Sequence, residues 1–204
     1  MANSVFDTTF QQQNVESKII VSLERISEAF KVLLWEDSKT HGLTPIQVQI
    51  LVFCLFHSPD KRKGKQLASE LNVTKATISD AVKTLEKKGL ISKTIETDAR
   101  SYIIELTSHG KNIAKNVSFF ANPLHSPIER LSEAKKGVLL KSLLDLISNL
   151  QSAGIISINR MCLSCKHYEQ RQEGHFCHLL QKKLSDQELR IDCSEYVAVP
   201  KPYK

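Results

Sequence analysis

The stretch VTKATISDAVKTLEKKGLISKTIETDARSYIIELTSHG, residues 73–110, carries the strongest pattern in the chain. In its first half, apolar residues recur at helical spacing behind a capping Thr74, which predicts an amphipathic helix over residues 74–88. Its second half has β-branched and aromatic residues on both sides of a polar tip, which predicts a hairpin of strands 91–95 and 102–106. A helix for the major groove beside a hairpin for the backbone or minor groove predicts a winged helix.

Further helices are predicted on both sides of this stretch. Apolar residues recur at helical spacing in each, and Thr44, Pro45 and Gln47 supply a capping box with Pro at the first helical position. A turn after Ser126, with Glu129 completing a second capping box, is expected to lead into the last helix. The short helix before the amphipathic helix forms a helix-turn-helix with it. The predicted helices cover residues 15–39, 45–56, 64–71, 107–121 and 133–152.

These elements divide the chain into three parts. Residues 1–14 lack apolar periodicity and are expected to form a flexible N-terminal arm. Residues 15–154 carry the helices and the hairpin, and predict a mainly α (α+β) winged-helix domain for DNA binding and dimerisation. Residues 155–204 hold four of the five cysteines and little periodicity, which predicts a separate small module.

One face of helix 74–88 is apolar, with residues such as Ile78, and the opposite face is polar and basic. Lys83 and Lys87 on that face suit phosphate oxygens or guanine edges, whereas Thr77 can contact a base or serve the helix cap. An isolated helix of this kind is most simply a charged surface helix, but the neighbouring helix and hairpin favour DNA recognition. The predicted DNA contacts are Lys75, Ala76, Thr77, Ser79, Lys83 and Lys87 in the helix, and Asp98 and Arg100 at the hairpin tip.

The distribution of charge supports the same interpretation. The net charge is +6, and between residues 61 and 111 there are 11 Lys and Arg against 6 Asp and Glu. Such clusters neutralise phosphates. The composition, 41% hydrophobic and 25% charged, is that of a globular protein. Because the sequence shows no signal-peptide pattern and no long apolar span, a cytoplasmic location is expected.

Three segments resemble the MarR family of bacterial transcription regulators. DARS at residues 98–101 is similar to the D-x-R wing of that family, and LTSHG at residues 106–110 to the L-T-x-x-G that follows it. LEKKGL at residues 85–90 is similar to the end of its recognition helix, and the order of helices agrees over residues 15–152. The resemblance implies a winged-helix homodimer that binds double-stranded DNA.

The resemblance also implies roles for particular residues. Arg100 is expected to reach the DNA backbone or minor groove, and Asp98 to orient basic side chains nearby. Many members have Arg where this chain has Asp80, so the family's base contacts are not carried over to that position. The wide apolar faces of helices 15–39 and 133–152 would stay largely exposed in a monomer, which favours a dimer. A two-fold dimer predicts a near-palindromic operator with half-sites about one helical turn apart.

Four cysteines define the C-terminal module: Cys162, Cys165, Cys177 and Cys193, spaced as C-x2-C, 11 residues, C, 15 residues, C. In a cytosolic chain this clustering favours metal binding over disulfides, and a metal can order a small module. The spacing resembles four-cysteine modules that hold a [4Fe–4S] cluster in accessory subunits of some glycyl-radical enzymes. An iron–sulfur cluster is therefore favoured narrowly, with zinc as the close alternative, and the remaining interpretation is four free thiols.

Other residues with metal or redox chemistry are assigned no site. His167, His175 and His178 are left out of the ligand set because four cysteines suffice. Cys54 lies in an apolar run and is expected to be a buried small hydrophobe rather than an oxidant sensor. His57 shows no partner pattern.

The leading functional prediction is a transcriptional regulator, not an enzyme, whose DNA binding is modulated by the four-cysteine metal centre. One alternative keeps the regulator but has structural zinc and a small organic effector. An alternative of another class is a redox or electron-carrier protein that uses the winged helix as a protein-binding scaffold. No Gly-rich phosphate loop, catalytic His/acid pairing or nucleotide fingerprint supports that alternative. No membrane partner is expected.

Overall fold

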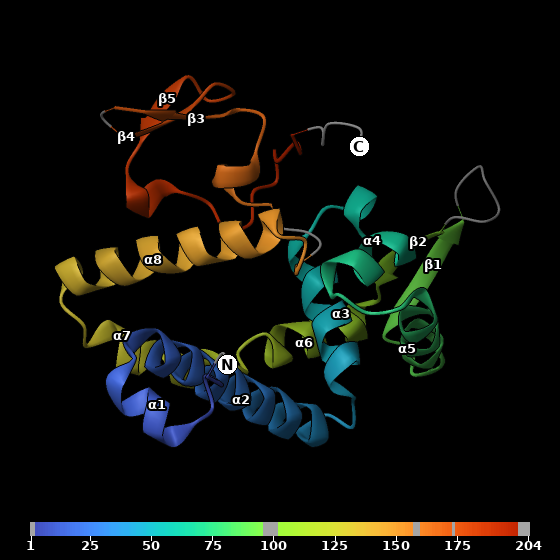
Figure 1. Ribbon diagram of the computed structural model, residues 1–204. Helices are drawn as coiled ribbons and strands as arrows, with labels where there is room; N and C mark the ends of the chain where they lie inside the picture. The colour runs from blue at the N-terminus through green and yellow to red at the C-terminus, as the bar shows by residue number, and fades with distance from the viewer. Residues whose placement is uncertain (1–2, 96–101, 157–159, 173, 200–204) are drawn as a thin grey trace.

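The computed structural model describes residues 3–95, 102–156, 160–172 and 174–199. Figure 1 shows a lobe of short helices with a protruding hairpin (residues 45–117, called the lobe below), the long helices at the opposite side, and a small sheet above the last helix. Within the described ranges, no helix is both long and apolar enough to cross a membrane.

The N-terminal segment contains a helix. Helix α1, Thr8–Gln13, begins where the Asp7 carboxylate accepts hydrogen bonds from two backbone N–H groups of the first turn. Asn14 then caps α2, Val15–Thr40. Apolar periodicity does not indicate α1, because its helix begins with a side-chain cap; the flexibility expected of residues 1–14 stays a prediction.

The helix-turn-helix forms as predicted. Gln47 Oε1 accepts the Thr44 N–H at 3.1 Å in the capping box. Asn72 takes a φ of 52° in the turn, and Thr74 Oγ1 then caps the next helix. The three helices are α3 (Pro45–Phe56), α4 (Gly64–Glu70) and α5 (Lys75–Lys87).

The predicted hairpin pairs strands β1, Ile91–Ile95, and β2, Tyr102–Leu106, antiparallel with Ile91 opposite Leu106. The segment before α4 extends this sheet, because Arg62 O accepts the N–H of Ile104 at 3.0 Å. The hairpin tip, residues 96–101, lies outside the described residues.

Helix α6, Ser108–Val117, packs closely against the start of the hairpin. Thr107 Oγ1 accepts the Gly110 N–H at 2.9 Å and so begins the helix. A Cβ on Gly110 would lie 1.8 Å from Leu90 O, so only glycine fits at this crossing.

The connection to the last helix differs from the prediction. Helix α6 stops short of residue 121, because the next N–H groups bond three residues back and tighten the chain into turns. Ser126 lies inside the short helix α7, His125–Glu129, and forms no capping box there. Ser132 instead caps α8, Glu133–Ser152.

The main core lies between α3, α5, α6 and the hairpin. Helix α3 is buried on most sides, while α5 and α6 each bury one face, as their amphipathic sequences require. The largest fully buried side chains here are Ile50, Leu51, Leu67, Ile78, Leu85, Ile104, Val48, Val82, Val117 and Cys54.

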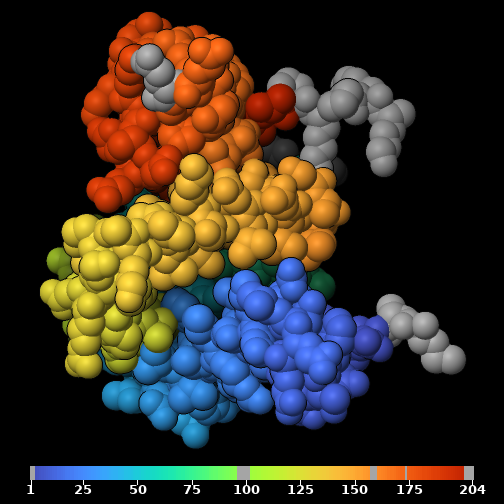
Figure 2. Space-filling view, turned by 60° about the vertical axis from the view of Figure 1, so that its left-hand side comes forward, coloured from blue at the N-terminus to red at the C-terminus, as the bar shows by residue number. Residues whose placement is uncertain are grey.

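The C-terminal module is a three-stranded sheet with the order β3-β4-β5, flanked by 3-10 turns. Leu189 and Met161 pack with Leu144 of α8 in a second, smaller core. Figure 2 shows the module stacked on α8, with α1 and α2 on the other side. Its elements are η3 (Cys162–Ser164), β3 (Tyr168–Arg171), β4 (Gly174–Cys177), β5 (Lys182–Leu184) and η4 (Asp186–Glu188).

Candidate DNA-recognition surface and cysteine pocket

The outer face of α5 presents the predicted DNA contacts to solvent. Ser79 is half-buried, and Lys83 pairs loosely with Asp80 at 3.8 Å. Thr77 serves the cap, because its N–H and its hydroxyl both contact Thr74 Oγ1. The exposed contacts are Lys75, Ala76, Thr77, Lys83 and Lys87, whereas Asp98 and Arg100 lie outside the described residues.

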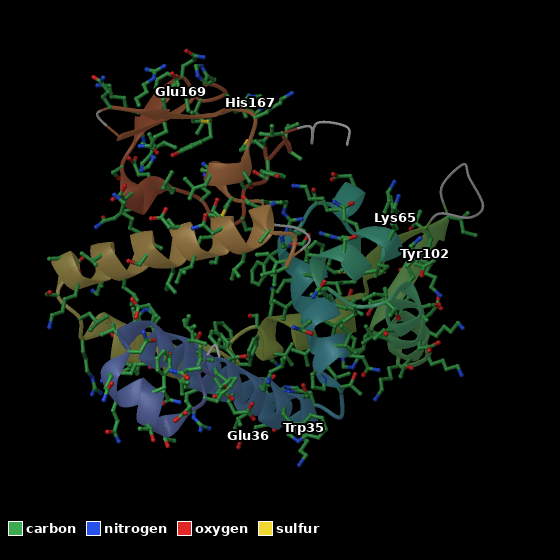
Figure 3. The ribbon with its side chains drawn as sticks, viewed as in Figure 1. Trp35, Glu36, Lys65, Tyr102, His167 and Glu169 are labelled. Carbon is green, nitrogen blue, oxygen red and sulfur yellow. The ribbon has the colours of Figure 1, made fainter. Side chains whose placement is uncertain are left out.

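Some of the basic residues counted with this surface have structural roles. Lys93 Nζ lies 2.6 Å from Glu86 Oε2 and over the Tyr102 ring, which ties the hairpin to α5. Lys88 Nζ donates to Gly42 O at 2.8 Å. Tyr102 lies beside α4 in Figure 3. The charge excess of this segment therefore overstates the number of lysines that can reach DNA.

The four C-terminal cysteines line one cavity of about 210 Å³ in the module. Cys162 is buried and its Sγ accepts the Arg190 N–H at 3.3 Å, while Arg190 Nη1 lies 3.7 Å from Cys193 Sγ. Burial raises the pKa of the Cys162 thiol, and the neighbouring cysteines raise it further. The module thus brings the Cys162–Cys165 pair together with Cys177 and Cys193, which lie 12 and 28 positions beyond Cys165.

The four thiols share a cavity without forming a group that could hold a metal ion. Among the described residues, no three His, Cys, Asp or Glu side chains are grouped so as to hold one metal ion. By their chemistry, four thiols around one cavity are donors that iron–sulfur clusters and zinc both use.

Two of the three nearby histidines have other partners. His175 is buried between Tyr168 and Asp186, at 2.7 Å and 2.8 Å. His178 Nε2 lies 2.8 Å from Glu169 Oε2. His167 instead lines the cavity with the cysteines, and Figure 3 shows it near the edge of the module.

Cys54 is completely buried inside α3, as predicted. Burial raises its pKa to about 12, although Arg62 lowers it in part. A thiol with so high a pKa holds almost no thiolate near neutral pH, and it is a packing residue rather than an oxidant sensor.

A polar junction that the sequence did not reveal joins the module to the lobe. The Arg160 guanidinium, only 6% exposed, bonds Asp192 at 2.8 Å and Glu70 at 3.1 Å. His57 Nε2 lies 2.7 Å from Asp192 and 2.8 Å from Arg160. Lys61 Nζ donates to Ser194 O at 2.8 Å.

The two carboxyl groups of the junction have different surroundings. Burial raises the pKa of Glu70 more than the nearby Arg160 lowers it. Partial burial would also raise the pKa of Asp192, but hydrogen bonds from Arg160 and His57 outweigh it and the pKa is lowered. Asp192 and His57 are 135 positions apart, so no local pattern marks the pair.

Comparisons with known proteins agree on the lobe. Residues 41–101 match the MarR family model. YetL, an HTH-type transcriptional repressor of Bacillus subtilis, is 30% identical over 136 residues, which cover 65% of this chain and 81% of that protein.

Solved structures show the same fold. The Staphylococcus aureus MepR–DNA complex matches with a TM-score of 0.57 at 25% identity, over 64% of this chain and 96% of that chain. A MarR protein from Peptoclostridium difficile matches with a TM-score of 0.59 at 20% identity, over 75% and 96% of the two chains, a likeness of fold alone. The family match lies within the lobe and does not extend to the cysteine module.

Proposed function

This chain belongs to the MarR family of transcriptional regulators, which are not enzymes, and we propose that it binds double-stranded DNA through α5 and the hairpin. The observation that carries the proposal is the exposed basic face of α5, held beside the hairpin by the ion pair of Lys93 and Glu86. The similar MepR structure contains DNA, which agrees with this use of the lobe.

The test is direct binding. Fluorescence anisotropy with duplexes selected from a random-sequence pool should show sequence-preferring binding that weakens steeply with salt. Equal affinity for selected and unselected duplexes would contradict a regulator that recognises an operator.

The protein is further proposed to act as a homodimer on a near-palindromic operator. In one chain, the only buried residues of α2 are Ser17 and Ser38, while apolar side chains such as Ile26 and Trp35 are 50% and 53% exposed. A second copy would cover this face. The apolar stripe of α8 contributes less to the proposed dimer interface than predicted, because its Leu144 packs against the module. Light scattering should give twice the chain mass.

The cysteine cavity is proposed to hold a [4Fe–4S] cluster that modulates DNA binding. The ligands would be Cys162, Cys165, Cys177 and Cys193, and the cluster would supply redox or oxygen sensitivity. The narrow preference for a cluster over structural zinc rests on the cysteine spacing in the sequence. Protein purified without oxygen should absorb visible light and contain about four iron and four sulfide per chain.

Two alternatives have distinct outcomes in the same experiments. Colourless protein with one zinc per chain, and DNA binding released by a small organic ligand, would indicate structural zinc with an effector in another site. An electron carrier without DNA binding has no support from the chain's family.

A further inference from the structure

We infer that the polar junction around Arg160 couples the cysteine centre to the helix-turn-helix, so that the state of the cysteines alters DNA affinity through α3 and α4. This inference rests on the proposed cluster and on the proposed DNA binding. It assigns the coupling to named contacts between the module and the lobe.

The carrying observation is the position of one proposed ligand. Cys193 stands between Asp192 and Ser194, and each of these neighbours touches the lobe: Asp192 contacts His57 at 2.7 Å, and Ser194 O accepts from Lys61 at 2.8 Å. If Cys193 loses its bond to the cluster, the backbone around it can rearrange. Asp192 and Ser194 then move with Cys193, and both of these residues bond to the lobe.

Arg160 joins the same loop to a second ligand. The Arg160 carbonyl oxygen accepts the Cys193 N–H at 3.0 Å. Arg160 also stands two residues before Cys162 in the sequence. Cys162 N–H in turn donates to Arg190 O at 3.0 Å. The two cysteines and the guanidinium are thus parts of one hydrogen-bonded unit.

On the lobe side, the contacts fall where the helices of the DNA-binding motif begin and end. His57 ends α3, stacks on Phe53 at 3.8 Å and bonds Phe53 O through Nδ1. Glu70 is the last residue of α4, directly before the turn that leads to α5. A change at the junction therefore acts on the placement of α4, which positions the recognition helix.

Burial makes these contacts strongly dependent on one another. Arg160 is 6% exposed and lies over the Phe53 ring at 5.4 Å, while Glu70 is 17% exposed. A buried guanidinium that loses one carboxylate cannot recover its hydrogen bonds from bulk water. The junction therefore has a paired arrangement that is stable only when loop 190–194 is held in place.

The test compares dissociation constants of the cluster-loaded and cluster-free full-length protein for a duplex selected by the loaded protein. In wild type, the two constants should differ at least about fivefold, the usual lower range for coupling between sites. The variant Lys61→Gln/Glu70→Gln removes the two charged groups that the lobe contributes to the junction at these positions. It changes no residue of the module. Its two dissociation constants should become nearly equal, while its visible absorption per chain stays at the wild-type value.

The matched control is Lys115→Gln/Glu129→Gln, which makes the same charge changes at exposed positions of α6 and α7, outside the junction, α5 and the hairpin. It should keep the wild-type ratio. A Lys61→Gln/Glu70→Gln variant that also keeps that ratio would overturn the coupling route, and equal constants in wild type would overturn coupling altogether. Absence of visible absorption in the wild type would refute the cluster itself and, with it, this inference, whereas sequence-specific DNA binding would stand.

Discussion

The helix-turn-helix lobe and the cysteine module are stabilised in different ways. Among the described residues, the core of the lobe buries 18 apolar side chains, whereas the second core buries 4, of which Leu144 belongs to α8. Apolar burial is the largest favourable contribution to folding, so the lobe can be ordered by its own packing. The module has much less of it and packs against Leu144 of α8. Under the proposed function, its order also depends on the group held by its cysteines.

The largest expected effect tests that dependence. Cys165→Ser removes one of the four cysteines that line the cavity, and binding of structural zinc contributes roughly 10–16 kcal/mol of folding free energy in zinc-finger peptides. We expect loss of the visible absorption and rapid proteolysis within residues 160–199, with the helical thermal transition of the lobe retained.

The control for this variant is Cys54→Ala, which removes a thiol in the core of the lobe. It should keep the visible absorption and lower the stability of the lobe instead. Equal absorption in Cys165→Ser and wild type would show that the cavity does not bind a cluster through this cysteine.

A second prediction compares one leucine in each core. Leu85→Ala empties a fully buried position of α5 and should cost about 2–5 kcal/mol of unfolding free energy, measured by urea denaturation with circular dichroism. Leu189→Ala lies in the small core and should leave this global transition within about 0.5 kcal/mol while speeding proteolysis of the module. Equal shifts of the global transition would mean that the two regions unfold as one unit.

The same contrast explains what the sequence can predict. The cap at Thr74, the two strands and their turn depend on neighbours in the chain, so their patterns are visible in residues 73–110, and the structure confirms the cap and the strand pairing. Helix α1 escaped prediction because a single capping carboxylate starts it. The hairpin tip with Asp98 and Arg100 lies outside the described residues, so their DNA contacts stay predictions.

The contacts between lobe and module could not be predicted. The pairs of Arg160 with Glu70 and of His57 with Asp192 join residues 90 and 135 positions apart, and only the fold brings them together. The apolar stripe of α8 shows the same limit of prediction from sequence. Helical periodicity identifies an apolar face but cannot tell whether Leu144 covers a module of the same chain or a partner.

A third prediction concerns the recognition surface. Lys83→Gln/Lys87→Gln removes two exposed charges of α5 and should reduce the slope of log affinity against log salt by about 2, with a loss of roughly tenfold in affinity at moderate salt. The variant Lys115→Gln/Lys141→Gln carries the same charge change on α6 and α8 and should keep the slope. A loss of slope in both would indicate an effect of net charge rather than of this face.

The smallest expected effect compares a capping hydroxyl in each region. Thr107 Oγ1 accepts the Gly110 N–H at 2.9 Å and donates to Gly89 O at 2.8 Å, partly shielded from water. Thr107→Val keeps the shape and removes both hydrogen bonds, and should cost about 1 kcal/mol of lobe stability by urea denaturation.

In the module, Ser185 Oγ lies 3.1 Å from Glu188 Oε2 in an exposed turn, where water can replace the lost bond. Ser185→Ala should therefore leave the urea midpoint of the lobe unchanged and alter proteolysis of the module only slightly. If Ser185→Ala instead shifted the lobe midpoint as much as Thr107→Val, the stability of the lobe would depend on the packing of the module. The lobe would then lack the independence that its larger core implies.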